Sequence, residues 1–358
     1  MKIGSAIDPL PVDQTVEAAR FLESCGYDSV WLSDETLVFN SPAKMVVPEL
    51  FPTLSMVAAA TNEVKVGTAV IDASIRHPAK TAQSVATVDS IAGGRMIVGI
   101  GGGEAGNREP FGMPMDHPFG RMEEVVRVMK LLFGATHENP VSFSGRFYSL
   151  KDAYLKIRPV QKGGPPMIVS AFGPRALRLA GEIGDGWLSF AHTPESYRRT
   201  LRGPVADAAR GAGRSLRGFR TALVVPICMS DDRRKAERIA TGIAKDWLAW
   251  SPDNMELIAP GVEAPKARQP YVKRNDPAAI RAVAEIAKGI PDSAAREIAI
   301  TGSPDECVEQ LARFGRSGVN HVILYIVAID RPWTEAARGV SKLVLPHLKT
   351  DQESARKG

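Results

Sequence analysis

The chain has few cysteines and no long hydrophobic run. Only three of its 358 residues are cysteines, Cys25, Cys228 and Cys307, and they lie far apart without a Cys-x-x-Cys pair or metal-ligand spacing. We therefore expect reduced thiols, a cytoplasmic location and no bound metal. No stretch reaches the roughly 18 uninterrupted apolar residues of a membrane-spanning helix. No apolar segment of a secretion signal follows Met1.

A strong charge of one sign is also missing. The 45 lysines and arginines slightly outnumber the 40 aspartates and glutamates, which leaves a net charge of +5. No dense basic run is interleaved with aromatic residues, so we expect neither a nucleic-acid partner nor a membrane partner. A mildly basic surface suits a small anionic ligand instead. The 44% hydrophobic content excludes a disordered chain.

What the sequence does contain is a regular alternation of short apolar strands and amphipathic helices. Strands are expected at residues 2–7, 29–32, 65–70, 96–100, 167–171, 186–188, 223–229, 297–300 and 320–327. Helices are expected at about residues 12–24, 53–61, 77–91, 120–133, 174–183, 195–210, 231–249, 304–316 and 333–348. Near-continuous apolar strands favour a parallel sheet, and eight main strand–helix pairs predict an α/β fold, a (β/α)8 TIM barrel. A doubly wound open sheet is the alternative.

The same pattern predicts a single barrel domain over residues 1–350. We expect insertions near residues 36–52, 135–165 and 250–296, and a flexible tail at 351–358. Within the second insertion, residues 141–148 alternate in polarity around a turn at Ser144 and Gly145, which predicts a β excursion.

Function in such a barrel is expected at the carboxyl ends of the strands. Asp34 and Glu35 follow the second strand, and because neighbouring residues point to opposite sides, at most one of them faces the pocket. The alternative is that Asp34 holds loop backbone, which leaves only Glu35 for chemistry. The glycine run at 101–103 lets a flat ligand approach the backbone, with Glu104 at the rim; a tight loop with a solvated Glu104 is the alternative. We expect no helix directly after it, as a dinucleotide fingerprint would require.

Two later strand ends offer further candidates. Residues 170–175 open a helix at a Gly-Pro pair, so uncapped N–H groups and Arg175 form a candidate phosphate site, with an ordinary helix cap as the alternative. Phe190 and His192 follow the sixth strand, and His77 lies in another loop that we expect on the pocket side. No group shows metal-ligand spacing and no Gly-x-Ser-x-Gly elbow occurs.

A series of short motifs runs in order along most of the chain. The segments are GYDSVWLSD at 26–34, VGTAV at 66–70, RHP at 76–78, SIAGGR at 90–95, GIGGGE at 99–104, FGPRA at 172–176 and AGEIGDGW at 180–187. Together they resemble the luciferase-like, flavin- and deazaflavin-dependent oxidoreductases. The branch that looks most similar uses coenzyme F-420 and includes methylenetetrahydromethanopterin reductases and sugar-phosphate dehydrogenases.

This resemblance implies a TIM barrel whose mouth holds the cofactor ring against a cis peptide between Ala69 and Val70. It implies cofactor contacts at Ala69, Val70, Gly102, Gly103, Asn107, Ser170, Ala171, Phe172, Gly173 and Arg175. It also makes Glu104 an acid that assists hydride transfer, with Glu35 and Asp34 as further catalytic candidates. His77, Phe190 and His192 are the candidate substrate contacts.

The sequence departs from the family pattern after two strands, and also in the long loop at 40–52 and the insertion at 251–291. Many deazaflavin enzymes have Asp-His after the second strand, where this chain has Asp34-Glu35, so Glu35 replaces the histidine base or signals different chemistry. The sugar-phosphate dehydrogenases place a hydroxyl and a lysine after the sixth strand. Phe190 and Thr193 stand there in this chain, which argues against a phosphosugar substrate.

We therefore expect an oxidoreductase that transfers a hydride between coenzyme F-420 and a small organic substrate. The alternative is an FMN-dependent luciferase-like monooxygenase that uses oxygen and receives reduced flavin from a separate reductase. A flavin-binding module without turnover is a third interpretation. Because relatives in this family often pair, we also expect a homodimer.

Overall fold

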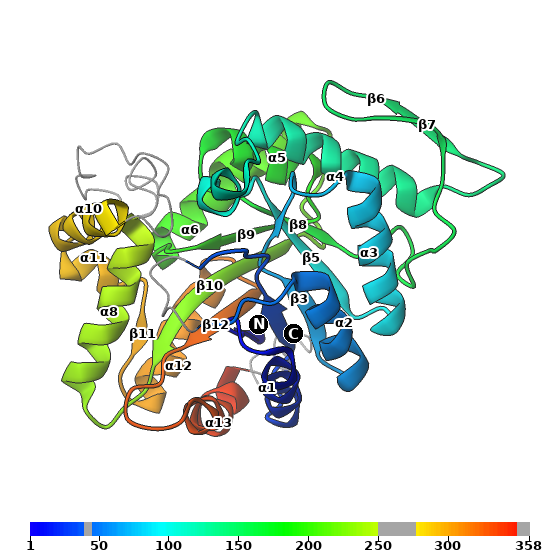
Figure 1. The fold of residues 1–358 in the computed structure, drawn as a ribbon. Helices are drawn as coiled ribbons and strands as arrows, with labels where there is room; N and C mark the ends of the chain where they lie inside the picture. The colour runs from blue at the N-terminus through cyan, green and yellow to red at the C-terminus, as the bar shows by residue number, and fades with distance from the viewer. Residues whose placement is uncertain (39–44, 250–276, 349–358) are drawn as a thin grey trace.

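The computed structural model describes residues 1–38, 45–249 and 277–348, and its centre is a closed barrel of parallel strands (Figure 1). The barrel strands are β1 (Lys2–Ala6), β2 (Ser29–Leu32), β3 (Lys65–Thr68), β5 (Met96–Gly101), β8 (Met167–Ser170), β9 (Gly186–Phe190), β10 (Arg220–Cys228) and β12 (His321–Ile326). They pair in that order, and β12 pairs with β1 to close the ring. The TIM barrel is therefore confirmed, and the open sheet is excluded.

The inside of the barrel is filled by side chains. One buried cluster holds an inward-facing residue from each of six strands: Trp31, Ile97, Ile168, Leu188, Ala222 and Ile323. At the amino end, Trp31 Nε1 donates to Ser29 Oγ at 2.7 Å, and this oxygen lies 2.7 Å from His321 Nε2. Burial lowers the pKa of His321 to about 4, so its ring is neutral at pH 7. The amino end is thus packed shut, which leaves the carboxyl end for a site.

Helices surround the barrel, and the largest apolar core lies between them and the strands. They are α1 (Val12–Ser24), α2 (Leu50–Ala60), α3 (Pro78–Ile91), α4 (Pro118–Gly134), α5 (Pro174–Ile183), α6 (Pro194–Thr200), α7 (Ala206–Gly211), α8 (Arg233–Ala249), α12 (Pro304–Arg316) and α13 (Trp333–Leu343). None of the helices in the described ranges has the length and apolar character to cross a bilayer.

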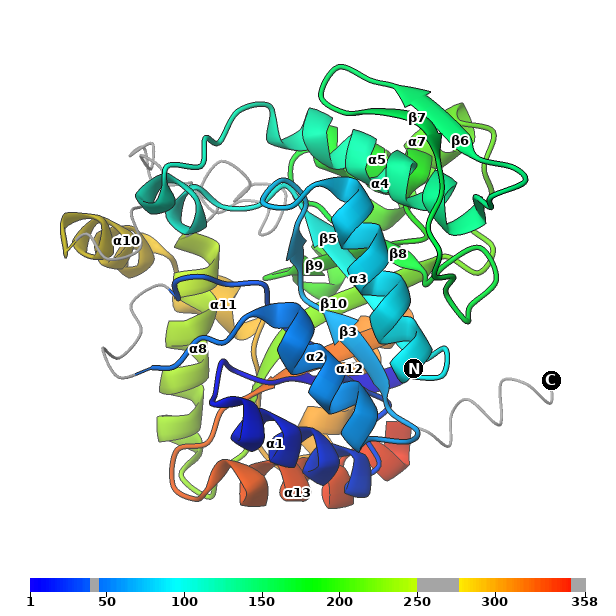
Figure 2. The same ribbon diagram turned by 45° about the vertical axis from the view of Figure 1, so that its right-hand side comes forward.

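The insertions lie on different sides of the barrel. The predicted β excursion is confirmed as an antiparallel hairpin of β6 (Val141–Ser144) and β7 (Ser149–Ala153) beside α4. The third insertion contains α10 (Pro277–Gly289) and α11 (Asp292–Arg296), which we did not predict and which pack on α8. Both views place these helices away from the hairpin (Figures 1 and 2). Residues 39–44 and 250–276 of the insertions, and the predicted tail, lie outside the described residues.

Some predicted boundaries are wrong for local reasons. The predicted strand 65–70 ends at Thr68 and is followed by the separate short strand β4 (Ile71–Asp72). Strand 297–300 is replaced by β11 (Ile300–Thr301), which pairs with β10 outside the closed ring. Helix 195–210 is divided by a π-type turn, because Pro204 has no N–H to donate and Gly203 is not helical. Helix α2 begins at Leu50, three residues early, because Glu49 accepts the N–H of Phe51 and caps it.

Candidate active site

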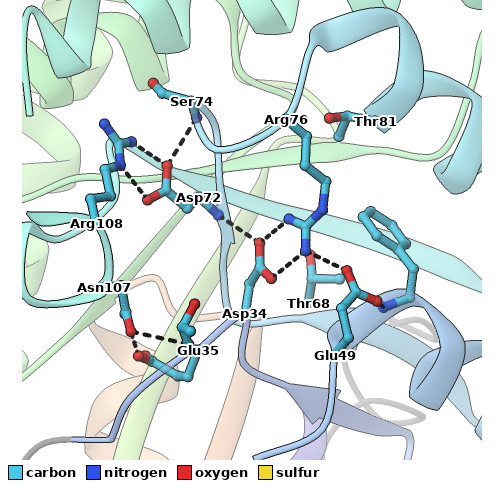
Figure 3. Close-up of polar contacts among 12 residues, drawn as sticks. Asp34, Glu35, Glu49, Thr68, Asp72, Ser74, Arg76, Thr81, Asn107 and Arg108 are labelled. Carbon is cyan, nitrogen blue, oxygen red and sulfur yellow. Dashed lines mark hydrogen bonds and ion pairs between the residues drawn. The ribbon is translucent and has the colours of Figure 1, made fainter. Parts of the chain in front are cut away.

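The carboxyl end of β2 is tied to its neighbours by paired charges (Figure 3). Asp34 accepts hydrogen bonds from both terminal nitrogens of Arg76, at 2.6 and 2.9 Å, and from the Asp72 N–H at 3.2 Å. Arg76 also donates to Glu49 at 2.5 Å. Because Asp34 is only 8% exposed and its oxygens are occupied, it anchors the loops after β2 and β4 to each other.

A second ion pair lies deeper, between β4 and the loop after β5. Arg108 Nε donates to Asp72 Oδ2 at 2.7 Å, and its Nη2 binds the other carboxylate oxygen. The same nitrogen donates to the Gly102 carbonyl at 2.9 Å. Neither side chain is more than 5% exposed, so water does not solvate the two charges and each is stabilised by the other. The pair fixes the glycine run relative to β4.

Asn107 holds Glu35 in place at the same side of the mouth. Its Nδ2 donates to Glu35 Oε2 at 2.5 Å, while its Oδ1 accepts the N–H groups of Thr36 and Leu37 at 3.0 and 2.9 Å. The amide is used from both ends, so the Glu35 carboxylate has a defined position. We call the group Asp34, Glu35, Asp72, Arg76, Asn107 and Arg108 the polar wall.

The backbone between these pairs is closely packed. The peptide bond between Ala69 and Val70 is cis, as the family resemblance implied. Thr68 Oγ1 donates to the Gly99 carbonyl at 2.8 Å and accepts the Gly99 N–H at 2.9 Å, which clips the end of β3 to β5. A Cβ added at Gly101 would lie 2.9 Å from Val70 Cγ2. Glycine is therefore what allows the strand after the cis peptide to lie against β5.

The glycine run continues into a short turn of 3-10 helix, η1 (Ala105–Asn107). This corrects our expectation that no helix follows the run directly. The turn is needed because it brings Asn107 back toward Glu35. Glu104 precedes it and is exposed at the rim, as predicted.

The loop after β8 fits an anionic group. Helix α5 begins at Pro174, and no side chain caps its amino end at Gly173. Its first-turn N–H groups therefore need acceptors from outside the helix, and a phosphate is well suited to provide them. Arg175 lies in that first turn and is exposed. Together with the glycine backbone of β5, these features fit a flat, phosphate-bearing cofactor.

Aromatic rings line another part of the mouth. The centroids of Phe172 and Phe190 are 4.5 Å apart, those of Phe190 and Trp247 are 5.7 Å apart, and those of Trp247 and Tyr325 are 5.7 Å apart. They come from the ends of β8 and β9, from α8 and from β12. All four side chains are half-buried. We call them the aromatic wall.

Asp8 lies beside this wall, two residues after β1. The Tyr325 hydroxyl donates to Asp8 Oδ2 at 3.3 Å. The Asp8 side chain is open to solvent, yet burial by surrounding protein raises its pKa, and the hydrogen bond from Tyr325 only partly opposes that shift. Burial likewise raises the pKa of Tyr325, with Asp8 adding to the shift.

The two predicted substrate histidines lie in different surroundings, since His192 is buried and His77 is exposed at the start of α3. His192 is 1% exposed, packs edge-on against Trp187 and Tyr197, and is held by Ser196 at 3.0 Å. Burial lowers its pKa to about 3. Its predicted place on the pocket side is wrong, because the residue lies behind β9. His77 instead caps α3, where its Nδ1 accepts the Ala79 N–H at 3.2 Å.

Sequence reasoning missed several residues of the mouth. They are Asp8, Thr68, Arg76, Arg108, Trp247 and Tyr325. A signal was present for Asp8, which directly follows a predicted strand, and for Tyr325, which shares the inward side of its strand with Ile323. The pairing of either arginine had no local signal.

Comparison with known proteins gives a consistent result. A family model described as luciferase-like monooxygenase matches residues 3–321. The chain is 27% identical over 330 residues to the 5,10-methylenetetrahydromethanopterin reductase of Archaeoglobus fulgidus, which covers 92% of this chain and 94% of that protein. It is 29% identical over 315 residues to the F-420-dependent glucose-6-phosphate dehydrogenase of Beutenbergia cavernae, covering 86% of each.

A solved structure supports the same fold. An F-420-dependent secondary alcohol dehydrogenase, in complex with an F-420–acetone adduct, superposes with a TM-score of 0.80 at 22% sequence identity. The superposition covers 97% of this chain and 98% of that one. The shared architecture extends over nearly the whole length of both proteins.

Proposed function

Because the chain belongs to the luciferase-like monooxygenase family, we propose that it is an oxidoreductase that transfers a hydride between coenzyme F-420 and a small organic substrate. The observation that carries this proposal is the amino end of α5, which no side chain caps and which follows β8, the strand next to the glycine-rich end of β5. Two of the relatives described above are named for their dependence on F-420. When bound, this cofactor supplies or accepts the hydride.

In this proposal Ala69 and Val70 back the cofactor ring, and Gly102, Gly103 and Asn107 lie along the ring and its side chain. The phosphate is received by the loop after β8 and by the uncapped start of α5. That loop comprises Ser170, Ala171, Phe172 and Gly173, with Arg175 adding positive charge. The absence of a side-chain cap on α5 supports this assignment, since the helix leaves its donors to an external anion.

The proton is handled by a carboxyl group of the mouth. Glu104 is exposed at the rim beside the glycine run and is our first candidate. Glu35 is the second, because Asn107 fixes its carboxylate nearby. We assign Asp34 an anchoring role, since Arg76 and the Asp72 N–H occupy its oxygens.

A titration of purified protein with oxidised F-420, and separately with FMN, tests the cofactor assignment. We expect F-420 to bind at micromolar concentration or tighter, read as fluorescence quenching. Micromolar binding of FMN without a response to F-420 would overturn the proposal. That result would favour the alternative, an FMN-dependent monooxygenase supplied by a separate reductase, which is consistent with the description of the family model.

A pair of glutamate variants tests the proton donor. Glu104→Gln keeps the size of the side chain but removes its titratable proton, so we expect turnover to fall by about 10²- to 10⁴-fold while F-420 affinity is retained. Glu109→Gln is the matched control, because Glu109 is also exposed and lies five residues further along the same loop. If Glu104→Gln turns over normally and Glu35→Gln does not, the role passes to Glu35.

We also propose that the protein pairs as a homodimer in the cytoplasm. The family resemblance supports the pairing, and the free thiols of Cys25, Cys228 and Cys307 support a reducing compartment. Sedimentation equilibrium checks the dimer, and cell fractionation checks the location.

A further inference from the structure

The aromatic wall is a continuous surface of rings with one hydroxyl. Its successive centroids are 4.5 to 5.7 Å apart, which is the spacing of rings in contact. Phe190, Trp247 and Tyr325 are only half-buried, so part of each ring remains open. Aromatic side chains placed this way offer a large apolar contact area with little loss of side-chain freedom.

Strand order sets the aromatic wall across the mouth from the cis peptide. The closed ring runs β1, β2, β3, β5, β8, β9, β10, β12, so β10 stands opposite β3. Phe190 ends β9 and Tyr325 lies in β12, and these strands flank β10 on either side. A flat group backed by Ala69 and Val70 therefore turns its other face toward the aromatic wall. The space between them is where a substrate is held.

Charge in the mouth disfavours an anionic substrate. Both arginines of the polar wall are engaged, Arg76 with Asp34 and Arg108 with Asp72. Among the described residues no lysine or arginine pairs with Asp8, whose carboxylate lies beside the aromatic wall. A negatively charged substrate group placed against these rings would meet Asp8, while Arg175, three residues after Phe172, is assigned to the cofactor phosphate by the proposed function.

The wall also carries a hydroxyl that can donate a hydrogen bond to a neutral oxygen. The Tyr325–Asp8 contact of 3.3 Å is long for a hydroxyl donating to a carboxylate, which normally lies near 2.6 Å. The hydroxyl is therefore weakly held and free to turn toward a substrate oxygen. Such an oxygen would also be close to the face on which the hydride is exchanged.

We propose that the aromatic wall is the substrate platform and selects uncharged carbonyl or hydroxyl compounds that carry a flat ring. Trp247 and Phe190 contact the ring of the substrate, and the Tyr325 hydroxyl donates to its oxygen. This assignment of substrate class rests on the proposed function, since it takes the opposite face of the mouth to be covered by the cofactor ring.

The test uses F-420-saturated protein and three probe ketones whose binding is measured by calorimetry. The probes are 2-acetylnaphthalene, its anionic analogue 6-acetyl-2-naphthoate, and cyclohexyl methyl ketone. We expect 2-acetylnaphthalene to bind about tenfold more tightly than either of the others, because it alone combines a flat ring with zero charge. This comparison needs no variant. Equal or tighter binding of the naphthoate, or no binding of 2-acetylnaphthalene at millimolar concentration, would overturn the proposal.

Variants then locate the binding surface. Trp247→Leu is expected to weaken 2-acetylnaphthalene about tenfold and to change cyclohexyl methyl ketone less than threefold. Tyr325→Phe keeps the ring and removes the donor, so both neutral ketones should weaken by about fivefold. Phe21→Leu is the control, because Phe21 packs against Trp333 on the outer helices and should leave every probe unchanged.

The outcomes separate this inference from the proposed function. Loss of F-420 binding in the unaltered protein would reject the proposed function itself. If F-420 binds, and Trp247→Leu folds but retains the full affinity for 2-acetylnaphthalene, only the substrate platform is rejected. Far-ultraviolet circular dichroism and F-420 affinity verify that each variant is folded.

Discussion

The two walls of the barrel mouth differ in the kind of contact that holds them. In the polar wall both arginines pair with buried carboxylates, and both the nitrogen and the oxygen of the Asn107 amide are hydrogen-bonded. In the aromatic wall the described contacts are almost all between rings, with one long hydrogen bond from Tyr325. The first arrangement fixes backbone positions, because removing any partner leaves a charge uncompensated. The second arrangement exposes apolar ring surface to a ligand, and substitutions in it should cost little stability.

The largest expected effect comes from breaking the buried pair of the polar wall. Arg108→Met leaves Asp72 charged and buried without its cationic partner, with only the Ser74 N–H among the described residues still bound to it, so we expect a loss of about 3–5 kcal/mol in the free energy of unfolding. Urea denaturation measures it. Arg127→Met is the control, because its pair with Glu123 is largely exposed and should cost about 0.5 kcal/mol or less. Equal losses of unfolding free energy in Arg108→Met and Arg127→Met would mean that the buried pair of the polar wall stabilises the fold no more than a surface pair does.

Next in size is the effect of adding a methyl group to the glycine run. A Cβ at Gly103 would lie 2.1 Å from Asp72 Oδ2, and the residue has a φ of +80°. We expect Gly103→Ala to cost about 2–4 kcal/mol, from the left-handed backbone together with displacement of the ion pair. Gly112→Ala isolates the backbone part, since Gly112 has a φ of +73° and no atom within 4 Å of an added Cβ. Its cost should be about 1–2 kcal/mol, by the same denaturation assay.

Two buried histidines outside the polar wall should make the stability of the protein depend on pH. Burial lowers the pKa of His192, behind the aromatic wall, to about 3, and that of His321 at the barrel floor to about 4, from an ordinary value of 6.5. The unfolded chain therefore takes up protons first on acidification. The stability these residues provide is complete above pH 6.5 and falls as the pH drops toward their folded values.

Between pH 6.5 and pH 5 the stability that each of the two histidines provides should fall by about 1.5 kcal/mol. Urea midpoints at the two pH values measure the combined drop. His192→Gln should remove about half of it. A variant that keeps the full drop would mean that His192 does not contribute.

The smallest effect is expected from the aromatic wall itself. Phe172→Leu removes a ring that is only half-buried and makes no polar contact. The free energy of unfolding should therefore fall by about 1 kcal/mol or less. Thermal unfolding would detect a shift of about 2–4 °C at most for a chain of this size. A loss as large as that of Arg108→Met would remove the contrast between the walls.

Much of the fold could be predicted because its signals are local. The strand and helix alternation, the glycines at 101–103 and the Gly-Pro start of α5 are all read within a few residues of one another. Family motifs added the cis peptide between Ala69 and Val70, which is present. The misplacement of His192 came from treating every residue after a strand as facing the pocket. The chain turns there at Ala191, which has a φ of +56°, and the side chain passes behind β9.

The sequence by itself determined the barrel and the residue types that gather after its strands, since hydrophobic period and turn residues act over short range. Only the tertiary structure decided the partners. Arg76 meets Asp34 across 42 residues of chain, and Tyr325 reaches Asp8 across 317. These contacts depend on how strands are registered and on the closure of β12 against β1, and no local pattern records either of them.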